Sequence, residues 1–345
     1  MAEISSYESN LAISDETILA FDDELARFTG DSVIKLPEIT SSINHDGQEC
    51  TPGLDLMPGL YLADQYEFTN GDPLKEPIRL SFNVQPSHRL GREVSHNKVF
   101  FINLVSKTQN GSKVFIDEQV AVKPVQRAVP LLGELAMFQY LKEVNIPTFQ
   151  PLGVLLTKNN PHYLLTRFQQ KIDTMDTLDW KEMDYEEKLF QLRYAIDTAV
   201  LLHTKLLFHG DLEFKNVGFN EIGEIFVVDP EVMRSGLSVA QSYYESTDDS
   251  IKHRHASKIS KKMSADFTDI CHSIDNFIFA DMPENLKLKQ DQAKFKVYKH
   301  YLFNPYREKI ASSGSAHIGL LLEAFNIMIH SKKELAQGKN LDHFA

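Results

Sequence analysis

The sequence predicts an α+β fold, with antiparallel strands in the N-terminal half of the chain and helices in the C-terminal half. Residues 78–84 alternate apolar and polar side chains, which is the pattern of a half-buried strand. The apolar runs 99–105 and 114–122 flank Asn110-Gly111, and Asn-Gly between two such runs is a strong hairpin signal. The N-terminal half therefore contributes at least three antiparallel strands.

Helical spacing begins after these strands and dominates the second half. Residues 129–144 carry a helical apolar stripe, and residues 177–207 contain neither Gly nor Pro and repeat apolar residues at helical spacing. Between them, 151–157 and 162–167 predict another strand pair. Residues 316–329 predict a helix that packs in the C-terminal part.

Composition restricts the class of protein. The chain has 345 residues, enough for two lobes, and its 42% apolar and 24% charged residues are typical of a soluble globular protein. The net charge of −12 argues against a nucleic-acid partner and is compatible with a cationic substrate. Only Cys50 and Cys271 are present, which excludes a disulfide scaffold or a cysteine zinc cluster. With no export signal or membrane-spanning segment, we expect a cytoplasmic protein with no membrane partner, whose oligomeric state the sequence leaves open.

Two acids and an amide lie near each other in one stretch of the chain. The apolar segment 225–228 predicts a buried strand that ends at Asp229, and 216–219 predicts its hairpin partner. This hairpin would bring Asn216 beside Asp229, and such oxygen ligands suit a hard cation. Asp211, on the preceding loop, would lie close enough to accept a proton. The layout is that of a phosphoryl-transfer site.

The motif HGDLEFKN followed by VVDPE resembles the catalytic and metal-binding loops of the protein-kinase-like fold. Gly210 and the ending Asp229-Pro230-Glu231 are more similar to aminoglycoside and choline phosphotransferases than to protein kinases. The resemblance implies that Asp211 is the catalytic base and that Asn216 and Asp229 bind Mg²⁺. The alternative is a structural hairpin with scattered acids.

The same resemblance assigns roles in the N-terminal half. Lys123 ends an inward-facing strand, where an ammonium group needs an anionic partner. In the related fold this lysine binds nucleotide phosphates and pairs with a helix glutamate, which corresponds to Glu134. A surface lysine is the alternative. The loop 85–98, with Gly91 and Ser95, would cover the phosphates, although it lacks G-x-G-x-x-G.

Further residues are assigned by the resemblance. The backbone of Phe168 and Gln170 would face the adenine. Lys215 would contact the transferred phosphate or simply be exposed, and His209 would support the loop. Asp269, preferred over Asp266, would hydrogen-bond the loop backbone.

The expected organisation has three parts. Residues 1–75 form an extension of unknown role, which includes a short amphipathic helix at 15–28. Residues 76–168 form the small nucleotide-binding lobe, and 169–345 the larger catalytic and acceptor-binding lobe. The basic segment 252–262 is expected in a solvated loop, the alternative being a site for an anionic substrate or a regulatory phosphate.

The sequence therefore predicts a two-lobed, ATP- and Mg²⁺-dependent phosphotransferase of the protein-kinase-like fold. It would move the γ-phosphate to a hydroxyl of a small-molecule acceptor of the aminoglycoside, amino alcohol or sugar type. The alternatives are a protein kinase and a nucleotide-binding pseudokinase that acts as an interaction module. The sequence does not name the acceptor, because acceptor pockets are built from variable elements.

Overall fold

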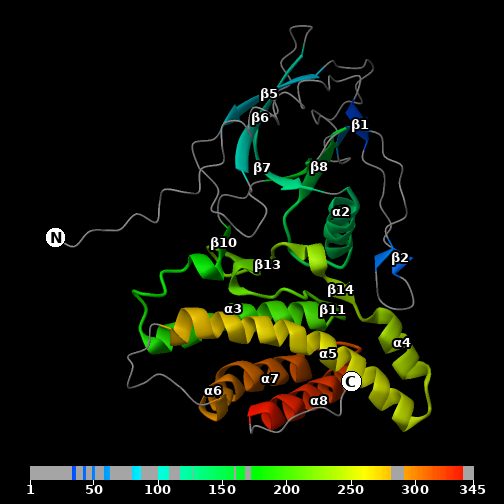
Figure 1. Cartoon of the computed structure of the whole chain (residues 1–345), viewed down its shortest axis with the longest axis vertical. Coiled ribbons are helices and arrows are strands. Elements are labelled where there is room, and N and C mark those ends of the chain that lie inside the picture. The colour runs from blue at the N-terminus through cyan, green and yellow to red at the C-terminus, as the bar shows by residue number, and fades with distance from the viewer. Residues whose placement is uncertain are drawn as a thin grey trace, which may run out of the picture. The chain divides into compact units, whose positions relative to one another are not determined.

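The computed structural model is mixed helix and sheet, and it describes eleven segments of the chain. These are residues 33–35, 42–43, 49–50, 58–62, 80–86, 100–108, 117–126, 128–158, 161–167, 172–280 and 291–336. The chain divides into two compact units, here called unit 1 and unit 2 (Figure 1). Unit 1 comprises 1–41, 51–139 and 149–170, and unit 2 comprises 42–50, 140–148 and 171–345.

Unit 1 contains a seven-stranded sheet. Its spatial order is β1 (Val33–Lys35), β4 (Gly59–Leu62), β8 (Pro151–Leu156), β9 (His162–Arg167), β7 (Asp117–Val125), β6 (Phe100–Thr108) and β5 (Leu80–Pro86). Neighbouring strands are antiparallel except β1 and β4, which are parallel. These two strands come from residues 1–75, so this part of the predicted extension belongs to the sheet. The helix expected at 15–28 lies outside the described residues.

One helix, α2 (Ala128–Glu143), follows the strand β7 and packs its apolar side in the core of unit 1. Leu131, Leu135 and Phe138 are buried together with Val154 and Leu164 of the sheet. The spacing of three and four residues between the helix positions places them on one face. This packing fixes the helix that carries Glu134.

Unit 2 contains small antiparallel sheets. The three-stranded sheet has the order β10 (Ile172–Thr174), β12 (Val217–Asn220), β13 (Ile225–Val227). Strand β11 (Leu207–Phe208) pairs with β14 (Arg234–Ser235), and β2 (Ser42–Ile43) pairs with β3 (Glu49–Cys50). The predicted turn after β12 is present: the Asn220 side chain accepts hydrogen bonds from the backbone of Ile222 and Glu224, and Gly223 has φ +82°.

Helices make up most of unit 2. They are α3 (Tyr185–His203), α4 (Leu237–Glu245), α5 (Asp249–Ile274), α6 (Asp291–Tyr298), α7 (Asn304–Ser312) and α8 (Ile318–Ala336). Short 3-10 turns occur at Met175–Thr177, Phe214–Asn216 and Pro230–Val232, and π-helical turns at Asp275–Phe279 and Lys299–Phe303. Helix α3 begins with a capping box between Asp184 and Glu187. The core includes Leu192, Phe267 and Tyr306, all almost fully buried.

The prediction that the basic segment 252–262 lies in a solvated loop is wrong, because α5 contains the whole segment. Residues 237–282 contain neither Gly nor Pro. Six apolar residues of α5 recur every three or four positions and are buried: Ala256, Ile259, Met263, Phe267, Ile270 and Ile274. This stripe extends the helical pattern toward the N-terminus, although interspersed Lys, Arg and His make the segment strongly polar. The basic run 252–262 therefore lies on a helix.

Candidate active site

Strand β13, which leads to Asp229, is fixed on both sides. On one side Val227 pairs with Val217 of β12. On the other side the Val227 amide donates to the Pro147 carbonyl at 2.9 Å, and the Thr148 hydroxyl donates to the Val227 carbonyl at 2.9 Å. Both backbone groups of Val227, two residues before Asp229, are therefore hydrogen-bonded.

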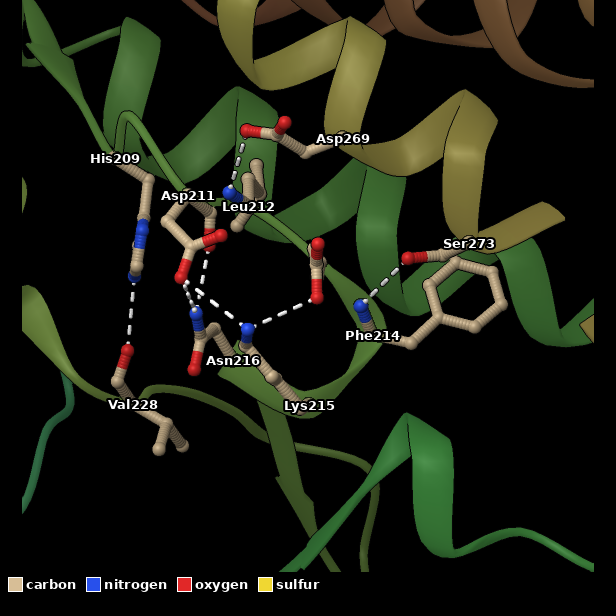
Figure 2. A network of polar contacts seen from close by, with 10 residues as sticks. His209, Asp211, Leu212, Phe214, Lys215, Asn216, Val228, Asp269 and Ser273 are labelled. Carbon is tan, nitrogen blue, oxygen red and sulfur yellow. Dashed lines mark hydrogen bonds and ion pairs between the residues drawn. The ribbon is translucent and has the colours of Figure 1, made fainter. Parts of the chain in front are cut away.

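The peptide before Asp229 is fixed by two groups of the preceding loop, and Figure 2 shows the contact from His209. The Val228 amide donates to the Asn216 carbonyl at 3.2 Å. The Val228 carbonyl lies 2.8 Å from Nε2 of the buried His209. Since a carbonyl only accepts, Nε2 of His209 carries the proton. This is the supporting position that the sequence suggested for His209.

Asp211 and Asn216 are in direct contact (Figure 2). The Asn216 amide donates to the Asp211 carbonyl at 2.7 Å and to the Asp211 carboxylate Oδ2 at 3.1 Å. The same Oδ2 lies 3.5 Å from the Lys215 ammonium, which also pairs with Glu213 at 2.9 Å. Within the described part of the chain no hydrogen bond to Oδ1 of Asp211 is found. The Asp211 side chain is 38% exposed, which leaves room for a further hydrogen-bond donor at this oxygen.

Asn216 itself carries the feature that fits a cation. The residue is 1% exposed, and its Oδ1 has no hydrogen-bond partner among the described residues. A buried polar oxygen without a partner is costly, and a bound cation would satisfy it. The described residues contain no group of three or more His, Cys, Asp or Glu able to bind a metal. An Asn–Asp pair is a different donor set, and Mg²⁺ is commonly bound by one or two protein ligands plus phosphate oxygens.

One face of α5 binds the backbone of residues 209–214, here called the catalytic loop after the motif that it resembles. Asp266 accepts from the amides of His209 at 3.0 Å and Gly210 at 2.6 Å. Asp269 accepts from the Leu212 amide at 3.1 Å, and Ser273 accepts from the Phe214 amide at 3.1 Å. The three side chains are three and four residues apart, so they lie on one side of the helix. Asp269 does bind the loop, as predicted, but Asp266 binds more of its amides.

Asp266 is also part of a buried polar chain. It is fully buried, and its Oδ2 lies 3.0 Å from Nε2 of His203. Nδ1 of His203 lies 2.8 Å from the Tyr306 hydroxyl. Burial, followed by the Asp266 charge, raises the pKa of Tyr306 well above its ordinary value. The phenol thus keeps its proton and donates to Nδ1, and the His203 Nε2–H donates to Asp266. His203 is therefore a packed residue of the unit 2 core.

Two charged groups beside the loop have displaced pKa values. Burial raises the pKa of Asp269 from 3.8 to about 6, and the nearby Asp211 charge adds to this against the opposing Leu212 hydrogen bond. Burial alone would lower the pKa of Lys215, but its contacts with Glu213 and Asp211 outweigh it and raise the pKa. Lys215 is therefore a cation beside Asp211 at neutral pH.

In unit 1 the predicted lysine–glutamate pair is present. The Lys123 ammonium lies 3.1 and 3.0 Å from the two carboxylate oxygens of Glu134. The Lys123 side chain is 12% exposed and that of Glu134 is 3% exposed. Strand β7 supplies the lysine and helix α2 the glutamate. A buried carboxylate requires such a partner.

Four predicted cofactor-binding residues, Gly91, Ser95, Phe168 and Gln170, lie outside the described residues. Ser273 and Glu213 contact the loop or Lys215 and were not singled out from the sequence. Glu213 could have been predicted as a site residue, because it lies within the motif that also carries Asp211. Ser273 could have been found from the helical period of α5, which places it seven residues after Asp266 on the same face.

The chain matches no protein-family model and no curated protein among those compared. Of the helices in the described segments, none combines the length and apolar character needed to cross a membrane. A functional assignment therefore rests on the residues and their geometry.

Proposed function

We propose that this chain is an ATP-dependent phosphotransferase of the two-lobed protein-kinase-like fold, resembling aminoglycoside and choline phosphotransferases. It transfers the γ-phosphate of ATP to a hydroxyl of a small molecule. The observation that carries the proposal is the Asp211–Asn216 pair. The Asn216 amide orients Asp211, and the other end of the same side chain leaves a buried oxygen without a partner in the described chain.

Asp211 is the residue proposed to act on the acceptor. Its Oδ2 is engaged by Asn216 and Lys215, which leaves Oδ1 to accept a hydrogen bond from the acceptor hydroxyl. The hydroxyl would then be oriented for attack on the γ-phosphorus and would lose its proton to Asp211 as the new O–P bond forms, while the bond from the γ-phosphorus to the β–γ bridging oxygen breaks and ADP leaves. The loop amides bound to α5 keep this carboxylate in position.

Asn216 and Asp229 are the proposed Mg²⁺ ligands. Bound Mg²⁺ supplies neutralisation of the phosphate charge, which is the main requirement of phosphoryl transfer. His209 acts indirectly, because it donates to the carbonyl of the residue before Asp229. Its role is to orient Asp229 relative to Asn216.

Lys123 is proposed to bind the non-transferred phosphates, with Glu134 orienting its ammonium. Lys215 is proposed to contact the transferred phosphate. Its contacts with Asp211 and Glu213 keep it charged and near the reacting oxygen. These roles require a cation at each position, so replacement by Met would weaken nucleotide binding or transfer.

The proposal is tested by comparing wild type with Asp211→Asn and with Asp179→Asn. Asp179 is an exposed aspartate whose side chain makes no hydrogen bond within the described residues, so it controls for loss of one charge. ATP with Mg²⁺ should raise the thermal unfolding temperature of all three proteins. Hydrolysis of ATP, or transfer to hydroxyl acceptors, should fall about 10²–10⁴-fold in Asp211→Asn alone.

Each rival function corresponds to a different result. Binding of ATP without hydrolysis or transfer in wild type would support a pseudokinase acting as an interaction module. Transfer of labelled phosphate from ATP to proteins, without transfer to any small hydroxyl compound, would support a protein kinase. If ATP with Mg²⁺ produces no stabilisation and no turnover, the phosphotransferase proposal fails.

A further inference from the structure

Five cations lie on one side of α5 and on the neighbouring β14, and they are here called the cationic face. Its members are Arg234, Arg254, Lys258, Lys261 and Lys262. Lys258 follows Arg254 by four positions, and Lys261 and Lys262 follow Lys258 by three and four, which places all four residues on the same side of α5. Lys262 is half-buried and the other four are exposed.

The cationic face adjoins the beginning of the catalytic loop. In the β11–β14 pair, Arg234 lies directly opposite Phe208, the residue before His209. Gly236, two residues later, packs so closely that a Cβ atom there would lie 2.8 Å from Ile259 of α5 and 2.9 Å from the Phe208 ring. Strand β14, the loop start and the middle of α5 therefore meet at one place.

The helix register leads to the same place. Lys262 precedes Asp266 by one helical turn, and Asp266 binds the His209 and Gly210 amides. Asp211 is three residues after Phe208, so their Cα atoms are at most about 10 Å apart. Arg234, which pairs with Phe208, therefore lies beside the start of the short segment that leads to Asp211.

The charges of this face are not neutralised. Within the described chain, none of the five cations forms an ion pair with a carboxylate at 4 Å or less, although the protein as a whole has a net charge of −12. Burial and the neighbouring Arg234 charge lower the pKa of Lys262. Burial and the charges of Lys258 and Arg254 likewise lower the pKa of His255. An anion would relieve this repulsion between like charges.

We propose that the cationic face, through Arg234 and Lys262, binds the phosphate group of an anionic acceptor. The acceptor would then be a phosphorylated hydroxyl compound, such as a sugar or polyol phosphate, instead of a cationic amino sugar or amino alcohol. This assignment of the acceptor rests on the proposed phosphotransferase function. An arginine fork and a lysine ammonium are a common donor set for phosphate, and the remaining cations raise its local concentration.

Binding is measured first, without nucleotide, so that the result does not depend on catalysis. Glycerol phosphate and glycerol are titrated into wild type at matched ionic strength by calorimetry. Wild type should bind glycerol phosphate saturably and glycerol not at all. The Kd of Arg234→Gln/Lys262→Gln for glycerol phosphate should be higher than that of wild type by a factor of about ten or more, because the variant loses two charged hydrogen-bond donors.

The control is Lys181→Gln/Lys296→Gln, which removes two exposed cations of unit 2 elsewhere in the sequence. It should bind glycerol phosphate as wild type does. Trp180 fluorescence in urea, which reports on the core of unit 2, verifies that both double variants fold. The proposal is overturned if wild type does not bind glycerol phosphate, or if the two double variants bind it equally.

A second arm distinguishes the source of the phosphate. Wild type is sedimented with phosphatidylserine vesicles and with phosphatidylcholine vesicles. Binding to the former without binding to glycerol phosphate would identify a lipid surface and overturn the acceptor assignment. Binding of glycerol phosphate without any phosphoryl transfer from ATP would retain the anion site and refute the phosphotransferase proposal instead. The two proposals can thus fail separately.

Discussion

Replacement of Asp266 by Asn should loosen the catalytic loop more than the same change at Asp269. Asp266 is fully buried, and its two oxygens accept from the His209 amide, the Gly210 amide and the His203 ring. Asparagine presents one acceptor and one donor in the same space. If the asparagine oxygen accepts from the His209 amide and the His203 ring, the asparagine NH₂ group faces the Gly210 N–H. The Gly210 amide is then left without an acceptor.

The expected cost follows from these contacts. A buried donor left without a partner costs about 1–3 kcal/mol, and the two remaining bonds lose their charged acceptor. We therefore expect Asp266→Asn to lower the free energy of unfolding of unit 2 by about 2–3 kcal/mol. Asp269 makes one loop hydrogen bond and is partly exposed, so its Asn variant can keep the Leu212 contact and turn its amide to water. That variant should lose less than about 1 kcal/mol.

The measurement uses the only tryptophan of the chain. Trp180 is 4% exposed and stacks on Phe214 of the catalytic loop, with ring centroids 5.4 Å apart. Its fluorescence in urea therefore reports on unit 2, and hydrogen exchange of the His209 and Gly210 amides reports on the loop. Equal destabilisation by the two variants, or a larger effect of Asp269→Asn, would refute the assignment of Asp266 as the main support of the loop.

Three further changes have distinct expected outcomes. The pKa of folded Asp269 is raised from 3.8 to about 6, so the stability that its protonated form contributes is complete below pH 3.8 and is lost as the pH rises through 6. Urea midpoints measured across this pH range should show the loss in wild type and not in Asp269→Asn. Lys123→Met should lower the free energy of unfolding by about 3 kcal/mol, because the buried Glu134 carboxylate loses its ammonium partner. The double variant Lys123→Met/Glu134→Leu should recover most of this stability. Hydrogen exchange of the α2 amides measures the stability of both variants, and no recovery in the double variant would contradict the ion-pair explanation. Gly210→Ala should lower the free energy of unfolding by about 1–2 kcal/mol, because φ is +78° and the new Cβ would lie 3.1 Å from the Val232 carbonyl oxygen. Gly319→Ala, which has open space around it in α8, should raise the free energy of unfolding by about 0.5–1 kcal/mol in the same urea assay. Equal effects of the two substitutions would contradict the argument from backbone conformation.

The parts of the molecule that the sequence predicted well depend on local patterns. The hairpin that carries Asn216 and leads to Asp229 is defined by a short apolar run and a turn, so adjacent residues determine it. The Lys123–Glu134 pair needed only a strand end and the following helix. In both cases the interacting groups are close in sequence, and the polar residue lies beside the apolar residues that position it.

The support of the loop by α5 was harder to predict because it depends on contacts across more than fifty residues. Asp266 and Asp269 are both acids at the same end of an apolar segment, and sequence alone ranked them in the wrong order of importance for the loop backbone. The decisive information is the helix register: Asp266 lies on the buried side together with Met263 and Phe267. A carboxylate on a buried face must have partners, and that constraint favours Asp266.

The backbone conformation of Asp229 supports the proposed role of the hairpin. Asp229 has φ +51° and ψ +64°, in the left-handed region, and it precedes Pro230, which by itself favours an extended residue at this position. Such a conformation persists only where the surroundings impose it. Here the preceding Val228 is bonded at its amide by Asn216 and at its carbonyl by His209. The residues proposed to serve the metal site are thus the ones that hold this backbone conformation, which favours the proposed metal site over a purely structural hairpin.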